Sequence, residues 1–305
     1  MTSTTRGFAL LALTILIWGA YMPVGRTVAD TVDPFWITAL RYAFAGVALS
    51  ALTARMEGPA ALRPPRRDLM TLVFLGALGS LGFGLFSYLG VRLTRPEHAA
   101  VITSLTPINV ALYRAARARR APPISLMATI VAVIVGAGLV VTRGDPATLL
   151  EGGGLTGDAL VLVASLCWTF YTIRAGSMTG YSPLRLTMLT CALGAPIGLA
   201  LAGGLTAAGW AKPPRLGDLA TIWPQLVYLF VLVSAVSILT WNAAVRAVGA
   251  QTATIVATFT PVIPFAWAAA NGQRLTLAEL GGVALMIGAI LAHNLSAATH
   301  VRTPA

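Results

Sequence analysis

The feature that most constrains this chain is a series of long apolar segments. Each holds about 18 or more residues, enough for a helix to cross a bilayer core of roughly 30 Å. Of the 305 residues, 57% are hydrophobic and only 10% are charged, and the mean hydropathy is +0.79. Soluble domains carry roughly 25% charged residues. The sequence therefore predicts an all-α membrane protein that crosses the bilayer repeatedly.

The segments predict ten transmembrane helices. They lie near residues 7–29, 34–54, 69–91, 96–116, 123–142, 157–178, 183–206, 220–246, 250–271 and 276–297. The first is too long for the core of a signal peptide, and no small-x-small cleavage site follows it. We expect it to remain as a helix of the mature protein.

Basic residues in the short loops predict the orientation, because cytoplasmic loops are enriched in Lys and Arg. With the N-terminus inside, the inner loops collect most of the arginines, including Arg63, Arg66 and Arg67. We expect both termini in the cytoplasm and the chain in a bacterial inner membrane. The net charge of +11 then reflects topology, and nucleic acid is not an expected partner.

The two halves of the chain share one plan. Residues 91–107 (VRLTRPEHAAVITSLTP) align without a gap with residues 245–261 (VRAVGAQTATIVATFTP), and 17–21 (IWGAY) align with 167–171 (CWTFY). Five spans per half is an odd number, so the second copy must enter the membrane from the opposite side. We predict a first five-helix repeat over 1–150 and a second, inverted repeat over 151–305, an architecture typical of secondary transporters.

The repeated Thr-Pro pairs raise a question about the backbone, because proline removes a hydrogen bond from a helix interior. Pro107 deprives the carbonyl of Thr103 of its partner, and Pro261 does the same to Ala257. Neighbouring threonine hydroxyls are expected to help satisfy these carbonyls. The two prolines are candidate hinges for alternating access; a structural kink and a direct role in cargo binding are the alternatives.

The assembled motifs resemble the EamA branch of the drug/metabolite transporter superfamily over nearly the whole chain. They are WGAYMPVGR (18–26), DPFWITALRYAFAG (33–46), WTFYTIRA (168–175), the Thr-Pro segments and GQRLTLAELGGVALMIGAIL (272–291). The resemblance implies ten-helix carriers with a cargo cavity between the halves, and commonly export of amino acids or related metabolites. The amino-acid exporters, including the aromatic type, are the most similar branch. The family often carries Glu just before the Arg that leads into the fifth and tenth helices. This chain has Arg119 and Gln273 at these two positions, so no role of that carboxylate carries over.

Acidic residues of the spans are best explained as helix caps. Thr276-x-x-Glu279 and Thr94-x-x-Glu97 have the pattern of capping boxes, and Asp33 and Asp158 lie at helix starts, where the macrodipole favours a negative charge. No carboxylate is then left near the midplane for a proton relay. We expect a facilitator or exchanger, with proton coupling through His98 as the alternative.

Arg26 and Arg41 are among the arginines that lie inside predicted spans. Arg26, near the end of its span, can reach the interface. Arg41 is deeper and needs a partner; we expect a structural pair with Asp30 or a carbonyl, with a substrate carboxylate as the alternative.

Aromatic and polar stripes on several spans predict a cargo site. Trp18, Tyr21 and Met22 share one helix face by their spacing, and Trp168 with Tyr171 repeats the pattern. The candidate substrate-binding residues are Trp18, Tyr21, Met22, Tyr88, His98, Trp168, Tyr171, Ser237 and Trp241. The competing explanation is helix packing through small and hydroxyl residues.

The predicted cargo is a small zwitterion, because aromatic walls can hold a side chain or an ammonium group. Organic cations such as quaternary ammonium compounds are the alternative. Lys212, which lies in a loop, cannot serve a retinal Schiff base, and the scattered histidines favour neither an enzyme nor a metal site. No cofactor is expected; the expected partners are the bilayer and a small molecule, and a monomer suits this plan.

Overall fold

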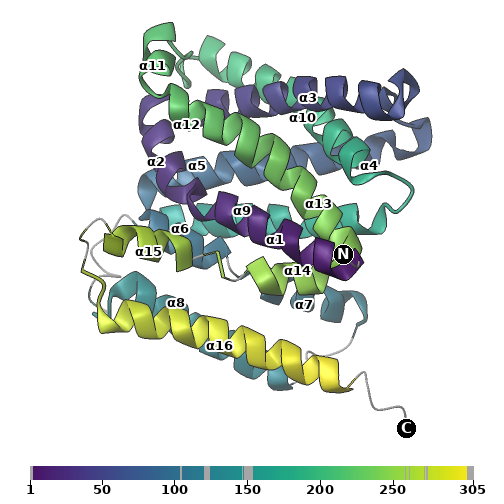
Figure 1. Ribbon diagram of the computed structural model, residues 1–305. Coiled ribbons are helices and arrows are strands. Elements are labelled where there is room, and N and C mark those ends of the chain that lie inside the picture. The colour runs from purple at the N-terminus through teal and green to yellow at the C-terminus, as the bar shows by residue number, and fades with distance from the viewer. Residues whose placement is uncertain are drawn as a thin grey trace.

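The computed structural model describes residues 3–103, 105–119, 124–145, 147, 154–257, 259–260, 262–270, 272 and 274–300 (Figure 1). Throughout this part of the chain the regular elements are helices, and no strand occurs. The predicted all-α class is confirmed for these residues.

The elements of the first half follow the predicted spans closely. They are α1 (Ser3–Gly19), α2 (Tyr21–Thr31), α3 (Pro34–Glu57), η1 (Pro59–Leu62), η2 (Arg66–Asp68), α4 (Leu69–Leu75), the π-helix η3 (Gly76–Gly82), α5 (Phe83–Leu93), α6 (Pro96–Thr103), α7 (Thr106–Arg117) and α8 (Ile124–Thr142).

The second half repeats this order. Its elements are α9 (Gly154–Ser177), α10 (Pro183–Ala207), α11 (Leu216–Thr221), α12 (Trp223–Val227), the π-helix η5 (Tyr228–Val236), α13 (Ser237–Val248), α14 (Ala250–Ala257), α15 (Val262–Ala270) and α16 (Leu277–His300).

Six helical segments are long and apolar enough to cross a membrane. They are Thr4–Thr31, Pro34–Glu57, Pro59–Leu93, Gly154–Ser177, Pro183–Ala207 and Trp223–Val248. The other four predicted spans are helical too, but they are interrupted or only partly described, so their crossing of the membrane stays a prediction.

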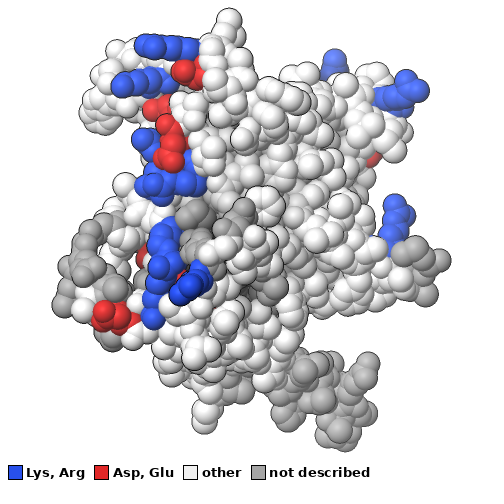
Figure 2. Space-filling model, turned by 60° about the vertical axis from the view of Figure 1, so that its left-hand side comes forward, with Lys and Arg blue, Asp and Glu red and all other residues white. Residues whose placement is uncertain are grey.

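The outer surface of the bundle fits a lipid environment. Large apolar side chains face outward, such as Val47 (74% exposed) and Ile134 (63% exposed). In Figure 2 charged side chains gather toward the two ends of the molecule, with a broad uncharged surface between them. An apolar band bounded by charge is what a bilayer core and its two interfaces require.

Matching caps fix the starts of α3 and α10, two corresponding helices; the one at Asp33 was predicted. The Asp33 carboxylate accepts a hydrogen bond from the Phe35 amide at 2.9 Å, and the Ser182 hydroxyl accepts one from the Arg185 amide at 3.0 Å. Proline follows each cap at the first helical position, where its missing N–H costs nothing.

Helices of one half pack mainly on helices of the other. α1 packs on α13 and α5 on α9, while α3 pairs with α10 and α8 with α16. If each helix is replaced by its counterpart in the other half, the contact of α1 with α13 becomes that of α9 with α5, and the pairs α3–α10 and α8–α16 are unchanged. In Figure 1, α3 and α10 form one flank and α8 and α16 the opposite one, and α1 begins at the same end of the bundle where α16 ends. This pattern is the one that two repeats related by a two-fold axis produce.

Small residues allow the closest of these contacts. A Cβ atom on Gly157 of α9 would lie 2.7 Å from the backbone carbon of Leu93, and one on Gly90 of α5 would lie 2.8 Å from the carbonyl oxygen of Gly157. Glycines at helix contacts are common in membranes, where close backbone approach drives association.

We expect Gly157→Ala to destabilise the protein, because the added methyl group meets backbone that cannot rotate away. Overpacking of this kind costs about 1–3 kcal/mol. The measurement is the apparent melting temperature of the detergent-purified protein. Gly203→Ala in α10 is the control: a Cβ there meets nothing within 4 Å, and we expect no loss. An equal drop in both variants would contradict the packing argument.

Candidate functional site

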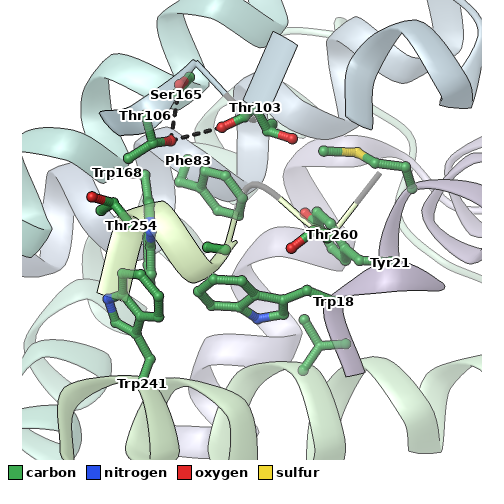
Figure 3. Close-up of a pocket in the computed structure, with 13 residues that line it drawn as sticks. Trp18, Tyr21, Phe83, Thr103, Thr106, Ser165, Trp168, Trp241, Thr254 and Thr260 are labelled. Atoms are coloured by element: carbon green, nitrogen blue, oxygen red, sulfur yellow. Dashed lines mark hydrogen bonds between the residues drawn. The ribbon is translucent and has the colours of Figure 1, made fainter. Parts of the chain in front are cut away.

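A cavity of about 70 Å³ lies in the middle of the bundle, between elements of both halves (Figure 3). Its walls are Trp18, Tyr21, Met22, Phe83, Thr103, Thr106, Ser165, Trp168, Val233, Trp241, Thr254, Ala257 and Thr260. None of these described lining residues carries a charge. The site therefore offers aromatic rings and hydroxyl groups.

Three tryptophans dominate the wall and touch one another. The ring centroid of Trp18 lies 5.3 Å from that of Trp168 and 5.0 Å from that of Trp241, and those two are 6.0 Å apart. They come from α1, α9 and α13, so residues more than 200 positions apart share one surface. Such ring pairs stabilise each other beyond the apolar area that they bury.

Hydrogen bonds hold two of these rings in place. Nε1 of Trp18 donates to the Ser237 hydroxyl at 2.8 Å, and Nε1 of Trp241 donates to the Thr172 hydroxyl at 3.3 Å. Ser237 in turn donates to the carbonyl of Val233 at 2.6 Å. The predicted site residue Ser237 thus lies behind the wall, where it positions Trp18.

Tyr171 also supports the wall from behind. Its ring stacks on Trp168 with centroids 5.0 Å apart, and its hydroxyl accepts a hydrogen bond from the Asn242 side chain at 2.8 Å. Of the nine predicted site residues, the structure brings Trp18, Tyr21, Met22, Trp168 and Trp241 to the cavity.

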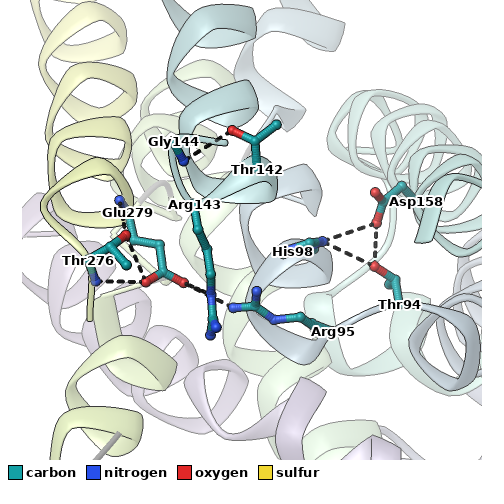
Figure 4. A network of polar contacts seen from close by, with 9 residues as sticks. All are labelled: Thr94, Arg95, His98, Thr142, Arg143, Gly144, Asp158, Thr276 and Glu279. Carbon is teal, nitrogen blue, oxygen red and sulfur yellow. Dashed lines mark hydrogen bonds and ion pairs between the residues drawn. The ribbon is translucent and has the colours of Figure 1, made fainter. Parts of the chain in front are cut away.

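Tyr88 and His98 are buried elsewhere. The Tyr88 hydroxyl accepts a hydrogen bond from Arg41 at 2.9 Å, and the His98 ring faces Thr94 and Asp158 at the start of α6. Figure 4 shows His98 directed toward these two residues. Neither side chain is among the cavity walls.

Arg41 differs from its predicted pairing. Asp30 pairs with Arg26, whose Nε lies 3.0 Å from the carboxylate, so it is not the partner of Arg41. The guanidinium of Arg41 instead donates to tyrosine hydroxyls. The expected pair with Asp30 was wrong because α2 turns Asp30 toward its own helical neighbour.

The first Thr-Pro segment breaks its helix at the cavity. α6 ends at Thr103 and α7 begins at Thr106, and the Thr106 hydroxyl donates to the carbonyl of Thr103 at 2.7 Å. This hydroxyl replaces the N–H that Pro107 lacks, as predicted. The backbone of Pro107 belongs to α7.

The second Thr-Pro segment also interrupts a helix beside the cavity. α14 ends at Ala257 and α15 begins at Val262; Pro261 itself lies outside the described residues. The Thr260 amide donates to the carbonyl of Ala257 at 3.0 Å. The buried Thr260 hydroxyl has no hydrogen-bond partner among the described residues, which leaves a polar atom available in the wall.

Two π-helices, which helical spacing in the sequence does not predict, flank the site at matching places in the halves. η3 ends just before Phe83, and η5 contains Val233, so each brings an apolar side chain to the cavity. Wider π turns rotate the faces that follow, so helical spacing of 3.6 could not assign Phe83 and Val233. Ser165 could have been found, since it lies three residues before Trp168 on one face.

A polar cluster joins the ends of α5, α6, α8, α9 and α16 (Figure 4). The buried Glu279 carboxylate accepts hydrogen bonds from Arg95 and Arg143, each at 3.0 Å. It also accepts one from the Thr276 amide at 2.9 Å, while its own amide donates to the Thr276 hydroxyl at 3.1 Å. The predicted capping box of α16 is confirmed, and two ion pairs add to it.

The predicted capping box of Thr94 and Glu97 stays a prediction, because the side chain of Glu97 lies outside the described residues. The Thr94 hydroxyl donates to the carboxylate of Asp158 at 2.5 Å, which joins α5 and α6 to the start of α9. Asp158 and Glu279 are thus engaged at helix ends, away from the cavity.

Comparisons with known proteins agree with this architecture. The sequence profile of the EamA-like transporter family matches residues 5–142 and 155–295. The chain is 23% identical to the uncharacterized transporter YrdR of Bacillus subtilis (strain 168), covering 93% of this chain and 91% of the relative. It is 24% identical to an uncharacterized transporter of Archaeoglobus fulgidus, covering 92% and 95%. The fold matches the crystal structure of a protein with a TM-score of 0.69, 18% identity and 99% coverage of both chains.

We expect Glu279→Gln to lower the apparent melting temperature, because Arg95 and Arg143 both lose their anionic partner. Breaking a fully buried pair costs about 3–5 kcal/mol; the effect here should be smaller, since both arginines are partly exposed. Asp30→Asn, which removes an exposed pair between residues one turn apart, should change stability by only about 0.3–0.5 kcal/mol. If the two substitutions lower the melting temperature equally, the polar cluster around Glu279 does not stabilise the fold more than an exposed ion pair does.

Proposed function

This chain belongs to the EamA-like transporter family, and we propose that it carries neutral and aromatic amino acids across a bacterial inner membrane by alternating access. The resemblance seen in the sequence is confirmed at the level of the family. The amino-acid cargo and the direction of export are proposals that rest on the chemistry of the cavity and on the resemblance to the amino-acid exporters.

The observation that carries the proposal is the uncharged aromatic cavity between the two halves. Three tryptophan rings supply faces on which an apolar side chain can pack or an ammonium group can rest. The hydroxyls of Thr106 and Thr260, together with carbonyls at the helix breaks, provide hydrogen-bonding groups close by. A small amphipathic zwitterion matches this combination.

The proposed architecture has ten transmembrane helices in two inverted repeats, 1–150 and 151–305, with both termini in the cytoplasm. The exchange symmetry of the helix contacts supports the inversion, and so does the return of α16 to the end where α1 begins. Each repeat contributes one broken helix to the cavity. Pro107 and Pro261 are therefore proposed as the hinges around which the halves rock.

We propose a facilitator or exchanger without a dedicated proton relay. The acids that could serve a relay, Asp158 and Glu279, take part in hydrogen bonds at helix ends, and the described cavity walls contain none. His98 is the group through which proton coupling would arise.

Counterflow in liposomes tests the proposal. We expect purified protein to exchange labelled neutral and aromatic amino acids in a saturable manner with no pH gradient. A quaternary ammonium compound run in parallel tests the second candidate, an organic-cation carrier, which the same tryptophans would suit. Transport of the cation alone, or amino-acid transport only under a proton gradient, would contradict the proposal.

We expect Trp168→Leu to raise the half-saturation concentration about 5- to 30-fold, the effect of losing roughly 1–2 kcal/mol of aromatic contact. Trp168 touches the other two tryptophans and lines the cavity. Trp210→Leu is the matched control, since Trp210 is 81% exposed at the end of α10 and should leave transport unchanged. If Trp168→Leu keeps the half-saturation concentration of the wild type, Trp168 does not contact the cargo.

A further inference from the structure

Arg41 is a charged residue buried in the middle of the bundle. Its side chain is completely inaccessible, and the guanidinium carbon lies 4.5 to 5.4 Å from the ring centroids of Tyr21, Tyr42 and Tyr88. Its two terminal nitrogens donate to the three tyrosine hydroxyls. We call these four residues the arginine cage.

The cage contains no negative charge. Among the described residues no carboxylate forms an ion pair with Arg41, and its Nε has no hydrogen-bond partner. The Thr38 and Ser87 hydroxyls, on the helices that flank the cage, are also buried and have no hydrogen-bond partner in the described part of the chain. A buried cation is costly unless it is paired, and charges within membrane helices usually mark the path of a substrate or an ion.

Local packing makes room for the guanidinium. Gly84 of α5 faces α3, and a Cβ there would lie 3.2 Å from Nη2 of Arg41 and 3.1 Å from Cγ2 of Thr38. A larger residue at this position would press on the charged group. The fold thus leaves space for a charged side chain at a helix contact that an uncharged residue could also form.

Tyr21 connects the cage to the cavity. It lines the cavity, and its hydroxyl accepts from Nη1 of Arg41 at 3.3 Å, the longest of the three bonds. A tyrosine hydroxyl that accepts a hydrogen bond still has its own O–H to donate. Donation from a hydroxyl polarised by a neighbouring cation is strengthened in a medium of low dielectric.

The matching place in the second half is neutral. By the local offsets between the repeats, which run from 149 to 154 residues, Tyr171 corresponds to Tyr21, Asn242 to Tyr88 and Thr187 to Thr38. There the Asn242 amide donates to both Tyr171 and Thr187 at 2.8 Å. The two halves therefore present the cavity with similar rings but different charge.

We propose that Tyr21, backed by the charge of Arg41, forms the carboxylate-binding end of the cargo site. This inference rests on the proposed function and narrows it to cargo that bears a carboxylate. The hydroxyl of Tyr21 donates to the carboxylate, and the carboxylate supplies the negative charge that the arginine cage lacks. The same positive charge disfavours organic cations.

The first test compares two cargoes on the wild-type protein. Counterflow of phenylalanine is measured against that of phenylalaninamide, which keeps the ring and the ammonium but has no carboxylate. We expect phenylalanine to be preferred about 10- to 100-fold, the range for a hydrogen bond to a charged group. This comparison needs no variant and so does not depend on a variant folding.

The second test uses paired variants. Tyr21→Phe removes the donor but keeps the ring, and Arg41→Gln removes the charge; each should abolish most of the preference by slowing phenylalanine. Tyr181→Phe, whose hydroxyl instead donates to Asp68 at 2.7 Å, and Arg26→Gln, whose charge is already paired, should keep it. Apparent melting temperatures establish that each variant is folded.

The outcomes separate the inference from the proposed function. If the wild type carries both compounds equally, the carrier function stands and the carboxylate site is overturned. A second outcome also overturns the carboxylate site: both compounds are transported only when chloride is present, and Arg41→Gln no longer needs chloride. In that case Arg41 pairs with an inorganic anion and not with the cargo carboxylate. Absence of counterflow for both compounds would reject the proposed function together with the inference.

Discussion

The arrangement of the helices depends on the backbone carbonyl groups that the two Thr-Pro segments deprive of their helical hydrogen bonds. Inside a bilayer no water is available to satisfy them, so irregular backbone is tolerated only where protein or a wet cavity surrounds it. Both broken helices meet this condition by turning their interruptions toward each other at the centre of the bundle. The position of the cavity follows from that requirement, since Thr103 and Ala257 must both lie where hydroxyls and neighbouring amides can reach them.

The two halves of the chain contribute similar aromatic groups to the cavity but different polar groups. The aromatic wall of the cavity is partly symmetric, since Trp18 and Trp168 come from corresponding helices of the two halves. Its polarity is not, because a cage around Arg41 lies behind one wall and the amide of Asn242 behind the other. A site of this kind can bind a molecule with two different ends in one orientation, while the symmetric scaffold still permits the halves to exchange conformations.

Much of the fold could be predicted from the sequence because its signals are local. Apolar length indicated the spans, and Asp33 and Thr276-x-x-Glu279 indicated where helices begin; the spacing of Trp18, Tyr21 and Met22 found three of the cavity walls. The rest depends on contacts between distant segments. The π turns pack against helices that are distant in the sequence, and the surroundings of Arg41 depend on how α2, α3 and α5 meet. Spacing along one helix contains no information about such contacts.

The arginine cage also bears on how the chain is made. Its tyrosines come from α2, α3 and α5, all within the first 93 residues. The hydrogen-bond partners of Arg41 are therefore all synthesised early, and α10, which packs along α3, completes the burial of the cage later. The tryptophan wall has no such independence, because the bond from Trp18 to Ser237 needs α13. During biosynthesis the hydrogen bonds of the buried charge need only the first half of the chain, whereas the cargo cavity needs both halves.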